Sequence, residues 1–119
     1  MSARILVVDD DRDIRDLVAI KLTSAGYDVT TRDDGAQALD AASAGGWSVL
    51  VLDVMMPGMS GIDVLRTLRA SGDRTPVILL TARGQEKDIE AGFAAGADDY
   101  VTKPFSPRAL LARITAALG

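Results

Sequence analysis

The chain has 119 residues, of which 48% are hydrophobic and 25% charged, and this size predicts one domain over residues 1–119. It contains no cysteine or histidine, which excludes disulfides, thiolate chemistry and the commonest general base and transition-metal ligand. The net charge is −4, the basic residues are scattered and no apolar run spans a bilayer, so we expect a cytoplasmic protein that binds neither nucleic acid nor membrane directly.

Short apolar runs alternate with segments of helical periodicity along the whole chain. The predicted strands cover residues 4–9, 27–31, 48–53, 75–81 and 99–103. The runs 5–8, 49–52 and 77–80 are apolar throughout, as in parallel strands covered on both faces, whereas 27–31 alternates more and should lie at an edge. The predicted helices run from Ile14 to Ala25, from Asp34 to Ala44, from Ser60 to a stop at Gly72, over 85–96, and from Ser106 to Leu118.

Apolar spacing also predicts which helix residues are buried. The stripes are Ile14, Leu17, Val18 and Leu22 in the first helix, and Leu110, Leu111, Ile114 and Leu118 in the last. The helix over 85–96 is the weakest, because Gly92 costs about 1 kcal/mol relative to alanine and only Ile89 and Phe93 are available as anchors. We therefore expect this helix to be the most mobile element.

Strict alternation of strands and helices predicts a doubly wound α/β fold, with a five-stranded parallel sheet and helices on both faces. Ligands bind such sheets beyond the carboxyl ends of the strands, where the strand order reverses. In the expected order 2-1-3-4-5, this reversal lies between the first and third strands.

Acidic residues follow both strands that border the reversal. Asp9, Asp10 and Asp11 end the first strand, and Asp53 ends the third. Four carboxylates converging there would repel one another, which is reasonable if a hard divalent cation is bound. With oxygen ligands only, Mg²⁺ is the natural candidate.

Two further polar side chains end the neighbouring strands. Thr81 follows the fourth strand and Lys103 the fifth. A phosphoryl group on Asp53 would have its charge matched by the metal, the Thr81 hydroxyl and the Lys103 ammonium. Each residue also has a purely structural interpretation, as a helix cap, a turn residue or a solvated charge. Their coincidence at four strand ends favours the phosphoryl site.

The motifs "LVVDDD", "LDVMMPGMSG", "LLTAR" and "GADDYVTKPF" occur in the order and spacing of a known family. Over its whole length the chain resembles the receiver domains of bacterial two-component response regulators, which have a flavodoxin-like fold. The resemblance implies that Asp53 is the phosphoacceptor and Asp10 a direct Mg²⁺ ligand. It further implies that Asp9 reaches the metal through water and that Met55 contributes its backbone carbonyl.

The resemblance also assigns the signalling residues. Thr81 matches the switch hydroxyl, Lys103 the phosphate partner and Tyr100 the switch aromatic, and the Lys103-Pro104 peptide is expected to be cis. By this resemblance a sensor histidine kinase supplies the phosphoryl group and docks around the first helix. The chain would assist only its own phosphorylation and dephosphorylation, and the surface of its fourth helix, fifth strand and fifth helix would respond.

The stretches "ARGQEKD" and "GADDYVTKPFSPRALLARI" most resemble receivers of winged-helix transcription regulators, whose active form dimerises through ion pairs on that surface. Asp99 and Arg113 match one pair. Ile89 and Ala109 stand where a second pair is common, and Ala94 and Thr115 where a third is. We therefore expect a homodimer on phosphorylation whose affinity depends less on salt than that of relatives with all of these ion pairs.

Three other functions compete with this one. A Mg²⁺-dependent phosphatase with an aspartyl-phosphate intermediate would need an acid two residues after the nucleophile, where Met55 stands. A flavin or nucleotide binder would need a phosphate-cradling loop after the first strand, where three aspartates would repel it. A degenerate receiver, acting only as a binding module, would lack one of the site residues.

A winged-helix effector would need residues after Gly119, so both a stand-alone receiver and a first domain stay open.

Overall fold

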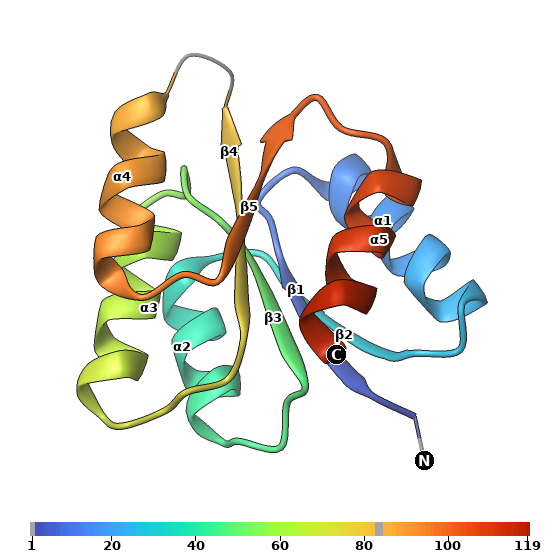
Figure 1. Ribbon diagram of the computed structural model, residues 1–119, viewed down its shortest axis with the longest axis horizontal. Coiled ribbons are helices and arrows are strands. Elements are labelled where there is room, and N and C mark those ends of the chain that lie inside the picture. The colour runs from blue at the N-terminus through green and yellow to red at the C-terminus, as the bar shows by residue number, and fades with distance from the viewer. Residues whose placement is uncertain (1, 83–84) are drawn as a thin grey trace.

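In the computed structural model, which describes residues 2–82 and 85–119, five strands alternate with five helices (Figure 1). The strands are β1 (Arg4–Val8), β2 (Asp28–Arg32), β3 (Val49–Asp53), β4 (Val77–Ala82) and β5 (Asp99–Lys103). The helices are α1 (Arg12–Ser24), α2 (Gly35–Ser43), α3 (Gly61–Ala70), α4 (Glu86–Ala95) and α5 (Pro107–Leu118). Each predicted element is therefore present. Arg83 and Gly84, within the quoted stretch "ARGQEKD", lie outside the described residues.

All strand pairs in the sheet are parallel, and the strand order is β2-β1-β3-β4-β5. This confirms both the predicted order and the edge position of the second strand. β1 lies between β2 and β3, with Ile5 opposite Val29 on one side and Val49 on the other. The order consequently reverses at β1, and the carboxyl ends of β1 and β3 lie side by side.

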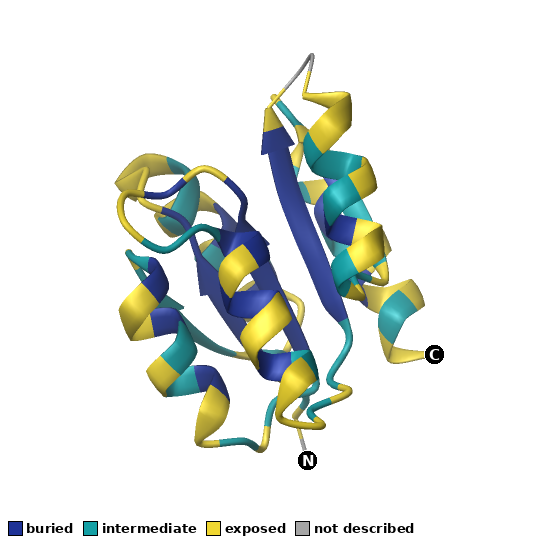
Figure 2. Ribbon diagram, turned by 90° about the vertical axis from the view of Figure 1, so that its left-hand side faces the viewer, coloured by how far each residue is buried: buried dark blue, intermediate teal, exposed yellow. Residues whose placement is uncertain are grey.

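Helices cover both faces of the sheet, with α2, α3 and α4 on one face and α1 and α5 on the other (Figure 1). Consecutive residues of β1 alternate between the two cores: Leu6 and Val8 face α2 and α3, while Ile5 and Val7 face α1 and α5. The sheet is buried through its centre, as Figure 2 shows. Within the described residues, no helix has the length and apolar composition needed to cross a bilayer.

Three residues predicted to be buried are instead exposed. Leu17 is 55% exposed, Phe93 46% and Leu118 37%, although Val18 and Ile114 of the same helical stripes are fully buried. A helix that packs on a sheet buries the rows of residues that face the sheet directly, and flanking apolar residues are covered only where another element reaches them. Nothing in the described part of the chain covers these three side chains completely.

The glycine inside α4 has a packing role. A Cβ added at Gly92 would lie 2.4 Å from Cδ1 of the buried Leu79 of β4, so glycine allows the helix to approach the sheet. Gly96 then ends the helix in the left-handed conformation, and the Arg69 side chain of α3 donates hydrogen bonds to its carbonyl. The low helix propensity of Gly92 therefore accompanies close packing at the C-terminal half of α4.

We expect Gly92→Ala to destabilise the protein, although alanine is the better helix former. Alanine gains about 1 kcal/mol in propensity, but forcing a methyl group into this contact costs about 1–3 kcal/mol. The measurement is the free energy of unfolding in urea. The control is Ala94→Gly, on the exposed side of α4, which should also destabilise, by about 1 kcal/mol. Stabilisation by Gly92→Ala would show that the close approach to Leu79 is unimportant.

Candidate functional site

The alternation of strand side chains directs three charged residues to one face of the sheet. The three residues are Asp9, Asp53 and Lys103. In each case the residue two positions earlier packs in the core against α1 and α5, and these residues are Val7, Val51 and Val101. Because every second side chain of a strand shares a face, Asp9, Asp53 and Lys103 follow them on the same side. The parallel register places these residues together at the carboxyl edge.

Lys103 lies between two buried carboxylates. Its Nζ is 2.8 Å from Oδ2 of Asp9 and 3.2 Å from Oδ2 of Asp53. Asp9 is 0% exposed and Asp53 is 3% exposed. Asp9 Oδ2 makes no well-aligned hydrogen bond within the described residues, so its short contact with the ammonium is mainly an ion pair. One cation thus faces two anions.

Burial and the excess of negative charge together shift the pKa values of Asp53 and Lys103. Burial and the neighbouring Asp9 carboxylate raise the pKa of Asp53 to about 7, although Lys103 acts in the opposite direction. For Lys103, burial favours the neutral amine, but contact with Asp9 and attraction by Asp53 outweigh it and raise its pKa. The lysine is therefore held charged, while Asp53 would be ionised more easily if another cation were present.

Asp10 adds a third carboxylate to this pair. Oxygens of Asp9, Asp10 and Asp53 lie within 4.8 Å of one another, and Asp10 is exposed at the open side. Asp10 and Asp53, but not the fully buried Asp9, line an open hollow of about 460 Å³ together with Asp11, Ile14, Met55, Ala82 and Lys103. An all-oxygen set, a buried Asp9 oxygen without a hydrogen bond and room for water fit Mg²⁺. The residues present thus fit the predicted cation.

The structure corrects the prediction of four convergent carboxylates. The side chain of Asp11 caps α1, because its Oδ1 accepts hydrogen bonds from the backbone N–H groups of Asp13 and Ile14. A helix N-terminus attracts such a carboxylate through its unpaired N–H groups. Asp11 therefore borders the hollow but is not one of the three carboxylates that converge.

The loop after Asp53 is kept close to β3. The N–H of Met55 donates to Asp53 Oδ1 at 3.3 Å, and the Met55 side chain is 62% exposed at the rim. Gly61, at the start of α3, allows the close packing: an added Cβ there would lie 2.3 Å from the carbonyl oxygen of Asp53. Sequence reasoning did not assign Gly61 this role, although its place in "PGMSG" is a usable signal.

Thr81 lies on the other face of the sheet from Asp53. It shares the face of Leu79, which packs toward α4, and it comes one residue after Leu80, the register partner of Asp53. Thr81 is fully buried, and within the described residues its Oγ1 has no hydrogen-bond partner. A buried hydroxyl without a partner is costly, which fits a hydroxyl that bonds an anion added at the site.

Tyr100 lies beside Leu79 in the register of β4 and β5 and is half-buried. Its ring meets the Phe93 ring edge-on, with centroids 5.8 Å apart and planes at 84°. Phe93 belongs to α4, so the aromatic pair connects β5 to that helix. The peptide between Lys103 and Pro104 is cis, as the resemblance implied.

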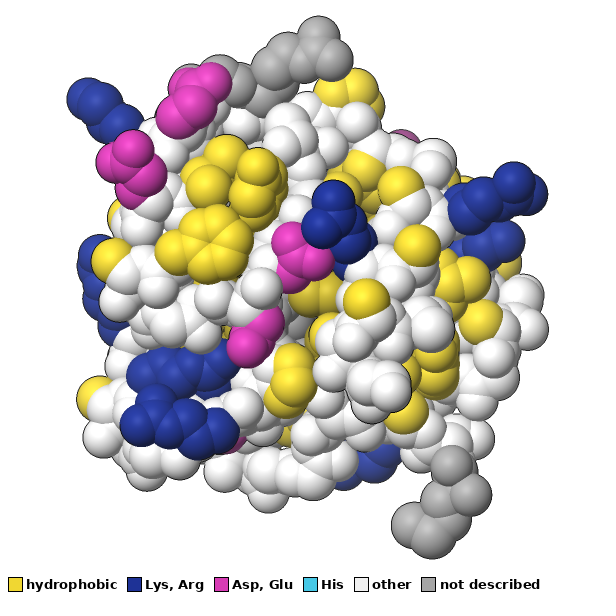
Figure 3. All heavy atoms as spheres, viewed as in Figure 1, with side chains coloured by type: hydrophobic (Ala, Val, Ile, Leu, Met, Phe, Trp, Pro, Cys, Tyr) yellow, Lys and Arg dark blue, Asp and Glu magenta, His cyan; other side chains and the backbone are white. Residues whose placement is uncertain are grey.

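The predicted association surface lies on α4, β5 and α5. Figure 3 shows hydrophobic side chains gathered over α4 and β5 on this face, and they include the half-buried Ile89 and the exposed Phe93. Asp99 and Arg113 pair within the chain, with Nη1 of Arg113 3.1 Å from Asp99 Oδ2. Ala109 lies beside Arg113 at a hollow of about 330 Å³.

Comparison with known families identifies this arrangement. The family model for the response regulator receiver domain matches residues 5–115. The chain belongs to this family. The matched range includes the four strand ends that carry Asp9, Asp53, Thr81 and Lys103.

Curated relatives of this receiver domain are longer proteins. The chain is 52% identical over 117 residues to a protein of Bacillus subtilis named "Uncharacterized transcriptional regulatory protein YkoG". It is 49% identical over 118 residues to "Response regulator MprA" of Mycobacterium tuberculosis. These matches cover 98% and 99% of the chain but 51% of each relative, so the chain spans about half the length of the curated relatives it matches.

Solved structures agree with the fold of the receiver domain. The receiver domain of the Francisella response regulator 1452 has a TM-score of 0.92 at 37% identity, with 98% of this chain and 97% of that chain covered. DrrB, described as a Thermotoga maritima OmpR/PhoB homologue, has a TM-score of 0.88 at 42% identity. That match covers 99% of this chain and 53% of DrrB.

The raised pKa of Asp53 predicts how Asp53→Asn changes stability without metal. In wild type, native Asp53 keeps a proton that the unfolded chain releases above its ordinary pKa of 3.8. The stability contributed by this proton is present at low pH and is lost as pH rises toward about 7. Asparagine carries no such proton, so the stability of Asp53→Asn relative to wild type should increase with pH, by at most about 4 kcal/mol.

The measurement is urea unfolding of both proteins across this pH range, in buffer with a chelator and then with saturating Mg²⁺. The cation favours the ionised carboxylate, so we expect it to reduce the trend in wild type. A difference between the two proteins that stays constant with pH would contradict the raised pKa.

Proposed function

We propose that this receiver domain is a phospho-accepting switch that takes a phosphoryl group on Asp53 in a Mg²⁺-dependent reaction with a sensor histidine kinase. The observation that carries this proposal is Lys103 placed between Asp9 and Asp53, with the Asp10 carboxylate alongside. This set leaves negative charge unmatched, which a divalent cation would neutralise. It also leaves an ammonium beside the nucleophile, where a phosphoryl oxygen would arrive.

In the proposed transfer, an oxygen of Asp53 attacks the phosphorus of a phosphohistidine on the kinase. A phosphorus–oxygen bond forms, the phosphorus–nitrogen bond breaks, and its electron pair returns to the imidazole nitrogen. When bound by Asp10, the Met55 carbonyl and, through water, Asp9, Mg²⁺ would supply positive charge to the phosphoryl oxygens. Lys103 supplies a second positive charge from the fifth strand.

The buried Thr81 hydroxyl would carry the signal to the surface. Within the described residues its Oγ1 has no partner in this structure, so a phosphoryl oxygen on Asp53 would offer it a hydrogen bond. Thr81 lies on the face of the sheet that α4 covers, next to the strand of Tyr100. A shift of Thr81 would open space for Tyr100 and change its contact with Phe93.

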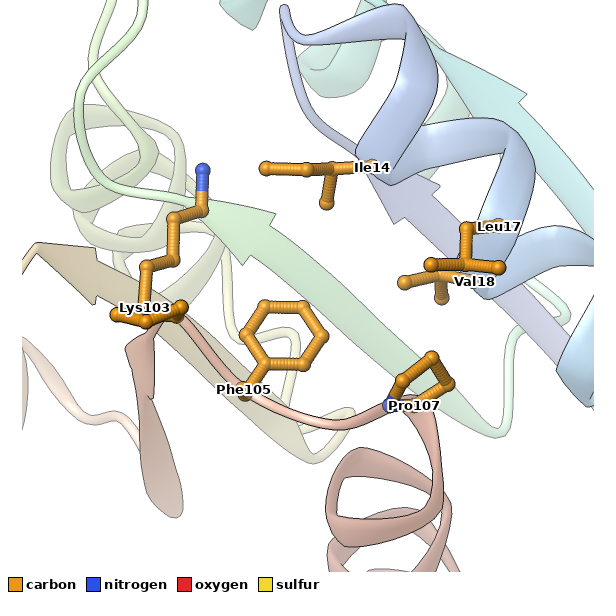
Figure 4. Close-up of a pocket in the computed structure, with 7 residues that line it drawn as sticks. Ile14, Leu17, Val18, Lys103, Phe105 and Pro107 are labelled. Carbon is orange, nitrogen blue, oxygen red and sulfur yellow. The ribbon is translucent and has the colours of Figure 1, made fainter.

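A shallow apolar groove beside the site supports docking of the kinase at α1. It has a volume of about 110 Å³ and is lined by Ile14, Leu17, Val18, Lys103, Pro104, Phe105 and Pro107. In Figure 4 the Phe105 ring lies between Lys103 and the α1 side chains. A helix that covers the exposed Leu17 would bring its neighbouring residues to the mouth of the acidic hollow.

The relatives named as transcriptional and response regulators support transcription as the output of the whole protein. We propose that phosphorylation drives homodimerisation through α4, β5 and α5. We further propose that the domain is not an enzyme acting on separate substrates. A small phosphatase is disfavoured by the side chain of Met55, and a degenerate receiver by the complete set of Asp10, Asp53, Thr81 and Lys103.

The first test is the intact mass of the protein after incubation with a small-molecule phosphodonor, with and without Mg²⁺. We expect one added phosphoryl group in the presence of Mg²⁺ and none when Mg²⁺ is chelated. Asp53→Asn should stay unmodified in both conditions, because the amide is not a nucleophile of comparable strength. A wild-type protein that gains no phosphoryl group would exclude the phospho-accepting switch.

The second test is sedimentation of the phosphorylated protein in low and high salt. Because Ile89 and Ala109 are uncharged and Asp99 pairs with Arg113 inside the chain, salt should change the dimer dissociation constant by less than about threefold. Phe93→Ser should weaken the dimer, and Leu17→Ser, on the opposite layer of helices, is the matched control. Loss of the wild-type dimer in high salt would contradict an apolar association surface.

A further inference from the structure

The backbone of Asp9 is held from two sides beyond the end of β1. Its N–H donates to the carbonyl of Arg32, at the end of β2, at 3.3 Å. Its carbonyl accepts a hydrogen bond of 2.9 Å from Nη1 of Arg15, which comes from the first turns of α1. Its side chain is held as well, because Oδ1 accepts from the N–H of Asp11 at 2.9 Å. Among the described residues, Arg15 is the one helix residue whose side chain donates a hydrogen bond to the Asp9 backbone.

The Asp9 carbonyl belongs to the peptide that joins Asp9 to Asp10. A peptide group is planar, so fixing the direction of its carbonyl also fixes where the next Cα lies, which is the point from which the Asp10 side chain leaves the backbone. Within the described residues, the carboxylate of Asp10 has no hydrogen bond or ion pair that would orient it. The direction of the Asp10 side chain therefore depends on this peptide.

Arg15 is a half-buried cation that contacts the backbone of Asp9, yet within residues 2–82 and 85–119 it forms no ion pair with a carboxylate of the site. Its Nη1 donates to a neutral carbonyl, so Arg15 does not compete with a cation for the carboxylate oxygens. The charge of Arg15 by itself repels a divalent cation at this site. Removal of the Arg15 side chain should weaken Mg²⁺ binding if its contact with the Asp9 carbonyl is more important. It should strengthen Mg²⁺ binding if the repulsion by its charge is more important.

We propose that Arg15 is a positioning residue of the metal site, which holds the Asp9 carbonyl so that the Asp10 carboxylate faces the cation. The proposal rests on the proposed function, because it assumes that the three carboxylates bind Mg²⁺. Arg15 touches neither the cation nor the phosphoryl group. It acts on the orientation of Asp10, as hydrogen-bond partners of ligands do in other metal sites.

The test is a titration with MgCl₂ alone, followed by amide chemical shifts of isotope-labelled protein, for wild type, Arg15→Gln, Arg15→Lys and Arg12→Gln. Arg15→Gln removes the charge and shortens the side chain, so we expect about tenfold weaker Mg²⁺ binding. Arg15→Lys keeps the charge and one donor and should restore part of the affinity. Arg12→Gln is the matched control: Arg12 lies on the same helix, 83% exposed and paired with Asp16, so its loss should leave Mg²⁺ binding equal or slightly tighter.

A second readout separates orientation from general damage to the fold. In phosphorylation by a small-molecule donor, Arg15→Gln should need about tenfold more Mg²⁺ for its half-maximal rate but reach a maximal rate near that of wild type. Urea unfolding of the metal-free variants checks that the native state persists. A lowered maximal rate with unchanged Mg²⁺ dependence would overturn the proposal.

Tighter Mg²⁺ binding by Arg15→Gln, matching Arg12→Gln, would mean that Arg15 acts only as a charge and would also overturn the proposal. A wild-type protein that binds no Mg²⁺ would instead remove the proposed function on which the inference rests. Weaker binding in Arg15→Gln, partial recovery in Arg15→Lys and no loss in Arg12→Gln together would support it.

Discussion

The site depends on one ammonium, that of Lys103, held between the carboxylates of Asp9 and Asp53. Both acids are almost completely buried, and burial of an ionised group is costly unless an opposite charge compensates it. Burial and the Asp9 carboxylate raise the pKa of Asp53 to about 7, because Lys103 compensates only one of the two negative charges. The same imbalance makes the pocket receptive to a hard cation, and the exposed Asp10 gives that cation a third carboxylate.

The sheet connects this imbalance to a distant surface because alternate residues of one strand face opposite layers. Asp53 and Lys103 face α1 and α5, whereas Thr81 faces α4. In the proposed switch, a change in charge at the site would reach α4 through the buried Thr81 hydroxyl and the adjoining aromatic pair of Tyr100 and Phe93. Arg69 and the close approach at Gly92 fix the C-terminal end of α4, whereas at the other end, within the described residues, the side chain of Gln85 makes no capping hydrogen bond.

Much of the fold followed from periodicity, because buried parallel strands leave long apolar runs and helices leave a repeat of 3.6 residues. Burial of individual residues was less predictable. Leu17, Phe93 and Leu118 fit the apolar stripes but are exposed, since a stripe shows which side of a helix is apolar and not how far its neighbours extend over it. Gly92 was interpreted as a weakness, whereas its contact with Leu79 depends on the distance between α4 and the sheet.

The residues of the site could be read from the chain alone: acids directly after β1 and at the end of β3, a threonine in β4 and a lysine at the end of β5, all at one edge of a parallel sheet. Their contacts became visible in the folded protein. It paired Lys103 with both Asp9 and Asp53, turned Asp11 away to cap α1, and brought Arg15 to the Asp9 carbonyl. Strand ends follow from local pattern, whereas contacts between side chains depend on register, helix placement and competition among nearby hydrogen-bond donors.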